Sequence, residues 1–376
     1  MKARKLMTWG MAVLMAASMT ACGGSGSADT TAAGTIAAAG TSAGSEAAGT
    51  GTEETTASGA AQGADAYADL PEMSLTIASS ASSTNITYQV QCDAAQAISD
   101  QTGGKLKINV VWDGTLGNDG ELVESCMGGS IPMISLASSP LLSYYPEIAL
   151  FDMPMVFSTR EQAYDGLKNF KDTFNPILQE KGMEVLAIGF QQFRGLSTNV
   201  NIQKPEDFQG MSIRTMENKY HMAFWENLGA KATPLAFSDL YLSLQQGLVQ
   251  AQDNPIGGVY ASKFYEVQDY FMPITAFPFV AFITMNKEAY DALPAAYQEL
   301  LVEFADQFME ESYKVMEEDD QHSFELIGDQ MTVLDYTQDI QDAMKKAAEP
   351  VWNDIRAAVG DELVDEYLKA AEQAAK

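Results

Sequence analysis

From residue 70 onward, short apolar segments with the alternation of β-strands are separated by segments with helical spacing. The first set has strand-like runs and helical runs in strict alternation, at residues 74–78, 88–101, 105–112, 116–127 and 133–136. A second set begins at residues 185–188 and continues through 211–214 and a helix over 238–247. Strand, helix, strand repetition is typical of a parallel sheet with crossover helices. We therefore expect an α/β fold with two doubly wound lobes.

One predicted helix is longer than the others. Apolar residues recur at helical spacing from Pro294, a favourable first-turn residue, to residue 328. A helix of more than 30 residues would span roughly 45 Å, longer than one lobe is wide. It is therefore predicted to brace both lobes, with the alternative that two shorter helices break in the acidic run at residues 317–320.

The N-terminus has the pattern of an export signal. Lys2, Arg4 and Lys5 precede an apolar stretch at residues 6–19 that is too short for a permanent membrane span. Residues 19–22 read Met-Thr-Ala-Cys, which resembles a bacterial lipobox. We expect a signal peptide at residues 1–21 and a lipidated Cys22 that anchors an extracytoplasmic protein to the outer face of the cytoplasmic membrane; the alternative is ordinary cleavage with Cys22 incidental.

Residues 22–69 separate this signal from the globular part. They are almost entirely Gly, Ala, Ser and Thr with scattered acids. Such a segment cannot bury enough apolar surface to offset the entropy of ordering it. The sequence therefore predicts a disordered tether over residues 22–69.

The charge balance excludes one class of partner. The chain has 22 Lys and Arg against 51 Asp and Glu, a formal charge of −29. Losing residues 1–21 removes three positive charges and leaves −29 − 3 = −32. Nucleic acid is therefore not an expected partner, because its recognition needs a basic face. Cys92 and Cys126 could form a disulfide in an oxidising compartment, but we favour two buried free thiols on helices that lie on opposite faces of the sheet.

Residues suited to catalysis are scarce. The chain has two histidines, His221 and His322, and it lacks HExxH, CxxC, GxGxxG and Walker A patterns. Both histidines are expected at the surface or in helix caps. The sequence predicts no cofactor, no metal and no enzyme, with an exported α/β hydrolase or a cell-surface sensory module as the alternative functions.

Arginine is rare enough for each position to matter. After signal removal four remain, and Arg194 and Arg214 fall inside apolar, strand-like segments. A buried guanidinium needs an acceptor with two oxygens, because an unpaired buried charge costs several kcal/mol. That acceptor is either a ligand carboxylate or an internal Asp or Glu, and the residues alone favour the internal salt bridge.

Four motifs resemble one known family. Residues 205–214 read PEDFQGMSIR, similar to the P-E-D-L-x-G-x-x-x-R segment of the extracytoplasmic solute receptors of TRAP transporters. Residues 229–241 resemble the family's G-A-x-x-x-P-x-x-F-x-E-x-Y segment, and residues 252–255 and 262–268 resemble Q-E-N-P and S-K-F-Y-E-V-Q. The resemblance runs in order from about residue 75 to the C-terminus and reverses the preference for an internal salt bridge.

The resemblance implies a monomeric two-lobed receptor that closes on a small organic acid and hands it to a membrane permease. Lobe I is expected at residues 70–191 plus 280–319, and lobe II at 192–279 plus 320–376. The expected ligand contacts are the carboxylate clamp Arg214, a second arginine Arg194, the cleft asparagine Asn254 and the flanking Phe237.

Three further polar residues are candidate cleft contacts: Ser80, Asp119 and Ser138. The alternative for each is that it merely caps a loop. The segment at residues 271–282 has four phenylalanines and two prolines. This segment would suit a ligand with an apolar or aromatic body, or it packs the hinge.

Overall fold

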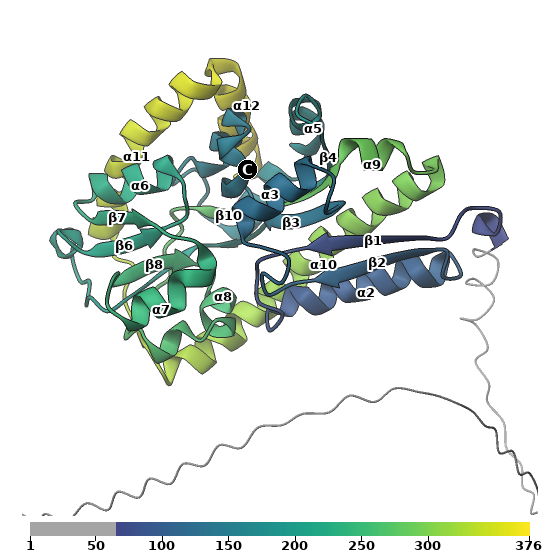
Figure 1. Cartoon of the computed structure of the whole chain (residues 1–376). Coiled ribbons are helices and arrows are strands. Elements are labelled where there is room, and N and C mark those ends of the chain that lie inside the picture. The colour runs from purple at the N-terminus through teal and green to yellow at the C-terminus, as the bar shows by residue number, and fades with distance from the viewer. Residues whose placement is uncertain (1–64) are drawn as a thin grey trace, which may run out of the picture. The chain divides into compact units, whose positions relative to one another are not determined.

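The computed structural model describes residues 65–376, drawn in colour in Figure 1. The predictions for the signal peptide, for Cys22 and for nearly all of the tether lie outside these residues. The first described element is a short 3-10 helix, η1 (Asp65–Tyr67), and the first strand begins at Met73.

The first sheet has five strands in the order β2-β1-β3-β10-β4. Their bounds are β1 (Met73–Ala78), β2 (Leu106–Val111), β3 (Met133–Ala137), β4 (Met183–Phe193) and β10 (Pro278–Asn286). Strands β1, β2 and β3 are parallel, whereas β10 is antiparallel to both β3 and β4. The α/β prediction is confirmed. Strand β10, which comes late in the sequence, lies between the earlier strands β3 and β4.

The crossover helices α2 (Ile86–Gln101) and α3 (Asp119–Met127) begin at asparagine caps. The Asn118 side chain accepts a hydrogen bond from the Glu121 N–H at 3.1 Å, and the Glu121 carboxylate accepts one from the Asn118 N–H at 2.9 Å. This capping box starts α3 at Asp119, three residues later than the apolar pattern predicts.

The helices α2 and α3 belong to different apolar clusters, and their cysteines are both free thiols. Cys126 is buried, but Cys92 is only half-buried.

The second sheet has six strands in the order β11-β9-β5-β8-β6-β7. They are β5 (Gly195–Thr198), β6 (Ser212–Thr215), β7 (Lys231–Pro234), β8 (Ala251–Asn254), β9 (Tyr270–Met272) and β11 (Thr332–Val333). The helices between them are α6 (Lys219–Asn227), α7 (Leu240–Gln245) and α8 (Ile256–Ala261). Below, lobe I means the first sheet with its helices and lobe II the second sheet with its helices. Arg194 is the single residue between β4 and β5, so it lies where the chain passes from lobe I to lobe II.

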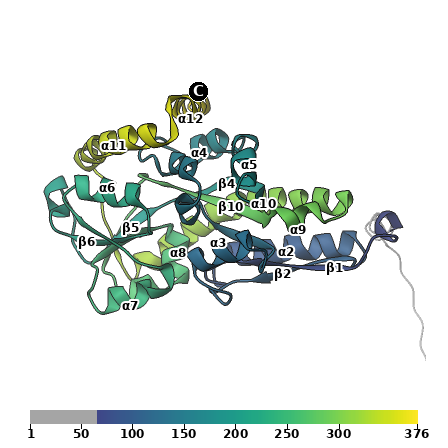
Figure 2. The same ribbon diagram turned by 45° about the horizontal axis from the view of Figure 1, so that its top comes forward.

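The long helix is continuous. α10 (Ala295–Gly328) has 34 residues and packs against β4 and α2 of lobe I and against α8 of lobe II. Figure 2 shows it extending from lobe I, beside α9, towards α8 of lobe II. The helix is unbroken as predicted, and the alternative of a break at residues 317–320 does not occur. Within this run Asp320 pairs with Arg160, whose Nη1 lies 3.1 Å from its Oδ2. Burial raises the pKa of Asp320 to about 7 in spite of this ion pair.

The other helices cover the outside of these layers. They are α4 (Arg160–Leu167), α5 (Lys171–Gln179), α9 (Lys287–Asp291), α11 (Gln338–Val359), α12 (Asp361–Ala374) and the 3-10 turns η2 (Ser139–Ser143), η3 (Pro146–Asp152), η4 (Pro205–Phe208), η5 (Phe237–Asp239) and η6 (Phe264–Glu266). α11 packs on both α6 and η3, and α12 packs on α4 beside lobe I. The lobe boundaries predicted from sequence stay a proposal.

Within residues 65–376, each helix is either too short or too polar to cross a membrane.

Candidate functional site

A cleft is lined by residues of both lobes. Its inner cavity has a volume of about 120 Å³ and its outer, wider cavity about 640 Å³. The two share wall residues, among them Ser80, Asp119, Arg214, Met216 and Phe237. They therefore form one continuous cleft, and Arg214 lies at the junction between its outer and inner parts.

Arg214 is a buried cation with no carboxylate in ion-pair contact among the described residues. It sits on β6, is only 2% exposed, and its Nε donates to the Leu235 carbonyl at 2.9 Å. No carboxylate oxygen of residues 65–376 lies within 4.0 Å of its guanidinium nitrogens. Burial, reinforced by the neighbouring Arg194, lowers the pKa of Arg214 to about 10. The group therefore stays charged at neutral pH, with nitrogens available to an acceptor in the cleft.

Arg194 has the opposite arrangement. Its Nη2 lies 3.0 Å from Oδ1 of Asp253 and donates to Oδ1 of Asn254 at 3.1 Å. Arg194 is 2% exposed and Asp253 is fully buried. Arg194 lines the inner cavity, but its charge is neutralised inside the protein. The internal salt bridge, which the residues alone favoured, is thus what the structure shows for Arg194. Asp253 was missed, although it stands beside Asn254 in a motif already recognised.

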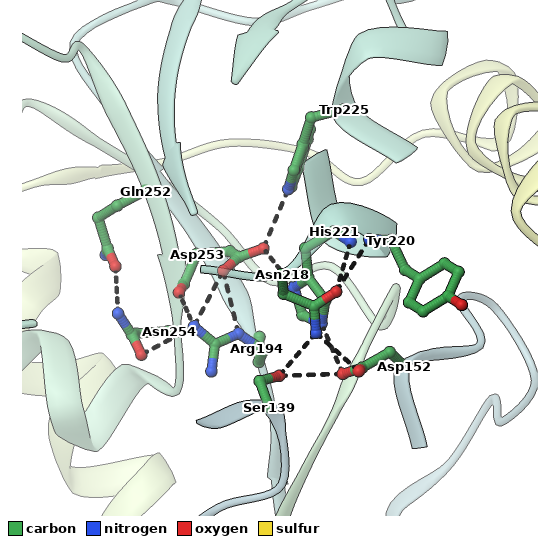
Figure 3. A network of polar contacts seen from close by, with 10 residues as sticks. All are labelled: Ser139, Asp152, Arg194, Asn218, Tyr220, His221, Trp225, Gln252, Asp253 and Asn254. Atoms are coloured by element: carbon green, nitrogen blue, oxygen red, sulfur yellow. Dashed lines mark hydrogen bonds and ion pairs between the residues drawn. The ribbon is translucent and has the colours of Figure 1, made fainter. Parts of the chain in front are cut away.

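The Arg194–Asp253 pair belongs to a larger polar network, which Figure 3 shows. Asp253 Oδ2 accepts the indole N–H of Trp225 at 3.0 Å. On the other side, Nε2 of His221 lies 3.1 Å from Oδ1 of Asp152, and the Asn218 amide donates to Oδ2 of Asp152 at 2.6 Å. Asp152 ends η3 on the lobe I side, whereas the other five residues come from lobe II or from the crossover to it. The network therefore ties the two lobes together.

His221 corrects a prediction. It is 1% exposed and stacks on Phe277 at a centroid distance of 3.8 Å, so it is neither a surface nor a capping residue; the cap of α6 is Asn218. His322 is exposed, as expected. Burial opposes charging of His221, but Asp152 and Asp253 outweigh it and raise its pKa. Nδ1 of His221 lies 3.9 Å from Asp253, too far for a hydrogen bond, so that attraction acts through charge.

The other candidates expected from sequence divide into two groups. Asn254, Phe237, Ser80 and Asp119 all line the cleft, and the Ser80 hydroxyl donates to Asp119. Burial raises the pKa of Asp119, against the opposing effects of this hydrogen bond and of Arg214. Ser138 is different, because it is buried outside both cavity linings and its backbone N–H bonds the Val280 carbonyl at 2.9 Å.

Most of the apolar wall was not predicted. The inner cavity is lined by Trp112, Leu136, Met216, Phe279, Phe308 and Met316. Of the four phenylalanines in residues 271–282, only Phe279 is among the cavity-lining residues; Phe277 stacks on His221, and Phe282 packs edge-on against Phe151 at 5.4 Å. The segment is therefore mainly hinge and core packing. The cavity wall is formed instead by apolar side chains from β3, from α10 and from Trp112, which directly follows β2.

Residues 65–376 contain no group of three or more His, Cys, Asp or Glu placed to hold a metal ion.

Residues 77–358 match the family described as bacterial extracellular solute-binding protein, family 7, DctP. The chain belongs to this family. It is an extracytoplasmic solute receptor of the TRAP type.

Relatives and solved structures agree with this assignment. A solute-binding protein of Verminephrobacter eiseniae is 32% identical over 251 residues, covering 64% of this chain and 73% of the relative. The 2,3-diketo-L-gulonate-binding periplasmic protein YiaO of Escherichia coli is 28% identical, covering 74% of this chain and 82% of the relative. The crystal structure of the sugar acid binding protein DctPAm from Advenella mimigardefordensis with galactonate superposes with a TM-score of 0.78, at 24% identity, over 81% of this receptor and 100% of that chain. This likeness confirms the two-lobed fold.

Proposed function

We propose that this receptor captures a small organic acid by clamping its carboxylate with Arg214 and delivers it to the permease of a TRAP transporter. The observation that carries the proposal is the buried Arg214 guanidinium at the cleft junction, which has no carboxylate partner within 4.0 Å among the described residues. A planar guanidinium binds a carboxylate through two parallel hydrogen bonds. That pairing strengthens as a closing cleft excludes water.

The relatives support a carboxylate as the bound group. The Escherichia coli relative is named for 2,3-diketo-L-gulonate, and the Advenella structure contains galactonate. Both are acids, so an arginine clamp would serve the group that they share rather than the rest of either molecule. Release to a permease requires the cleft to open so that the carboxylate leaves Arg214. Movement of the two lobes relative to each other, about the crossover at Arg194, would open it.

We further propose that Cys22 is lipidated and anchors the receptor outside the cytoplasm. This rests on residues 1–22 alone. Mass spectrometry of the mature N-terminus tests it directly: a diacylglycerol-modified cysteine supports the anchor, and an unmodified residue beyond position 22 removes it.

The binding proposal is tested by thermal-shift screening of the mature chain, freed of bound ligand by unfolding and refolding, against a library of organic acids. Ligand binding raises the melting temperature by mass action whatever the chemistry. Each acid is paired with its neutral amide, which has the same body without the charge. We expect at least one acid to stabilise the protein and its amide not to do so. Stabilisation by no carboxylate would overturn the proposal.

A further inference from the structure

The cleft's wall composition carries an inference about which acids fit. It rests on the proposed function, because it takes the clamp at Arg214 as given. We infer that the ligand is a monocarboxylate with an apolar, ring-sized or branched body, and not a dicarboxylate or a polyhydroxylated acid.

Charge limits the number of carboxylates. The cations lining the inner cavity are Arg194 and Arg214, and the outer cavity has Arg214 alone among the described residues. Since Asp253 already neutralises Arg194, a single cation is left for a ligand. The outer cavity is instead lined by acids: Asp113, Asp119, Glu121, Glu124 and Glu217. A second carboxylate would meet these like charges and no free cation, which is unfavourable.

Hydrogen bonding limits the number of hydroxyl groups. Polar side chains do line the inner cavity, but most are bonded within the protein. Asn254 accepts from Arg194 at 3.1 Å and donates to Gln252, and the Gln192 amide donates to Asp320. Thr87 and Asn85, which also line this cavity, bond each other, because the Thr87 hydroxyl donates to Asn85 at 2.8 Å. A ligand with many hydroxyls would lose its bonds to water without replacing them, which costs free energy for each unpaired group.

Apolar surface supplies the remaining contact. Phe237, Met216 and Phe279 line the inner cavity and are only half-buried, so part of each side chain is open for a ligand to cover. The indole N–H of Trp112 donates to Gln91 at 2.8 Å inside lobe I, so Trp112 offers the cavity its ring and not its donor. Covering such surfaces favours binding in proportion to the apolar area removed from water.

The test compares four probes by calorimetry on the refolded mature chain: phenylacetate, 4-methylpentanoate, succinate and gluconate. We expect phenylacetate or 4-methylpentanoate to bind at least tenfold more tightly than both succinate and gluconate. Tighter binding of succinate or gluconate would overturn this inference and leave the proposed function standing. Binding of none of these, together with no hit in the wider acid library, would overturn both.

A variant then tests the wall itself. Phe237 is half-buried and lies at the cavity junction, so Phe237→Ala should fold, which circular dichroism checks. We expect it to weaken binding of the preferred apolar acid at least fivefold and to change succinate binding less than twofold. Equal losses for both acids, or none, would contradict an apolar contact at this wall. If the variant does not fold, the comparison of the four probes on the unmodified chain still decides the matter.

Discussion

Nη2 of Arg194 lies 3.0 Å from Oδ1 of Asp253, whereas Arg214 has no carboxylate within 4.0 Å among residues 65–376. Both arginines are 2% exposed and both line the same inner cavity. They therefore differ in their electrostatic partners and not in their burial. Arg194 is a fixed part of the crossover between the lobes, whereas Arg214 is the cation that we propose a ligand carboxylate neutralises.

The first prediction concerns the clamp. Arg214→Lys keeps the charge but replaces a planar two-pronged donor with a point charge. We expect binding of the organic acid found in the screen to weaken at least about tenfold, or roughly 1.4 kcal/mol. Calorimetry measures this, and Arg356→Lys, a surface arginine paired with Asp361 at 3.0 Å, is the matched control. Unchanged affinity in Arg214→Lys would contradict the clamp.

The second prediction concerns the fixed pair. Asp253→Asn preserves the shape of the side chain but leaves the Arg194 charge buried and unpaired. Breaking a buried ion pair from one side typically costs about 3–5 kcal/mol, so we expect a loss of that order in the free energy of unfolding. Urea titration measures it. Asp361→Asn removes one of the two carboxylates that pair with Arg356 at the surface and should change stability little. Equal effects of the two variants would show that burial does not matter here.

The third prediction concerns pH. The pKa of His221 is raised in the folded protein, so the folded state binds this proton more tightly than the unfolded chain, whose histidines titrate near 6.5. The stabilisation from charged His221 is complete below about pH 6.5 and is lost as the pH rises through the raised folded value.

Urea titrations at a series of pH values from 6 to 9 should therefore show stability falling with pH in the natural chain. The fall should be smaller in His221→Gln, which cannot gain the charge. His322→Gln is the control, because His322 is exposed. Parallel profiles for the natural chain and His221→Gln would mean that the Asp152–His221–Asp253 contact does not hold a proton.

The fourth prediction concerns the crossover between lobes. A Cβ at Gly195 would lie 2.2 Å from Cζ of Phe271, closer than any normal contact. Gly195→Ala should therefore displace a buried ring and destabilise the protein by about 1–3 kcal/mol. Gly328→Ala is the matched control, because a Cβ there meets no atom within 4 Å. Thermal unfolding compares them, and similar melting temperatures would show that the Phe271 ring moves freely.

Much of the secondary structure follows from local pattern. Period-two and helical spacing located β1, β2, β3 and the crossover helices to within a few residues, because each element depends on neighbours in the chain. The long helix was predicted, unbroken, from its apolar spacing. The ion pair that holds Asp320 was not predicted, because Arg160 comes from a distant part of the sequence. The antiparallel insertion of β10 between β3 and β4 was also beyond local pattern.

The sequence by itself determined the alternating α/β architecture, the long helix and the two arginines worth attention, since these depend on residue type and spacing. The tertiary structure decided which arginine lacks a carboxylate partner among the described residues. Asp253 is 59 positions from Arg194, and Asp152 is 69 from His221. Such pairings arise only when folding brings distant strands and turns together. A buried charge is neutralised only by an opposite charge within a few ångströms in space, and spacing along the chain does not predict that distance.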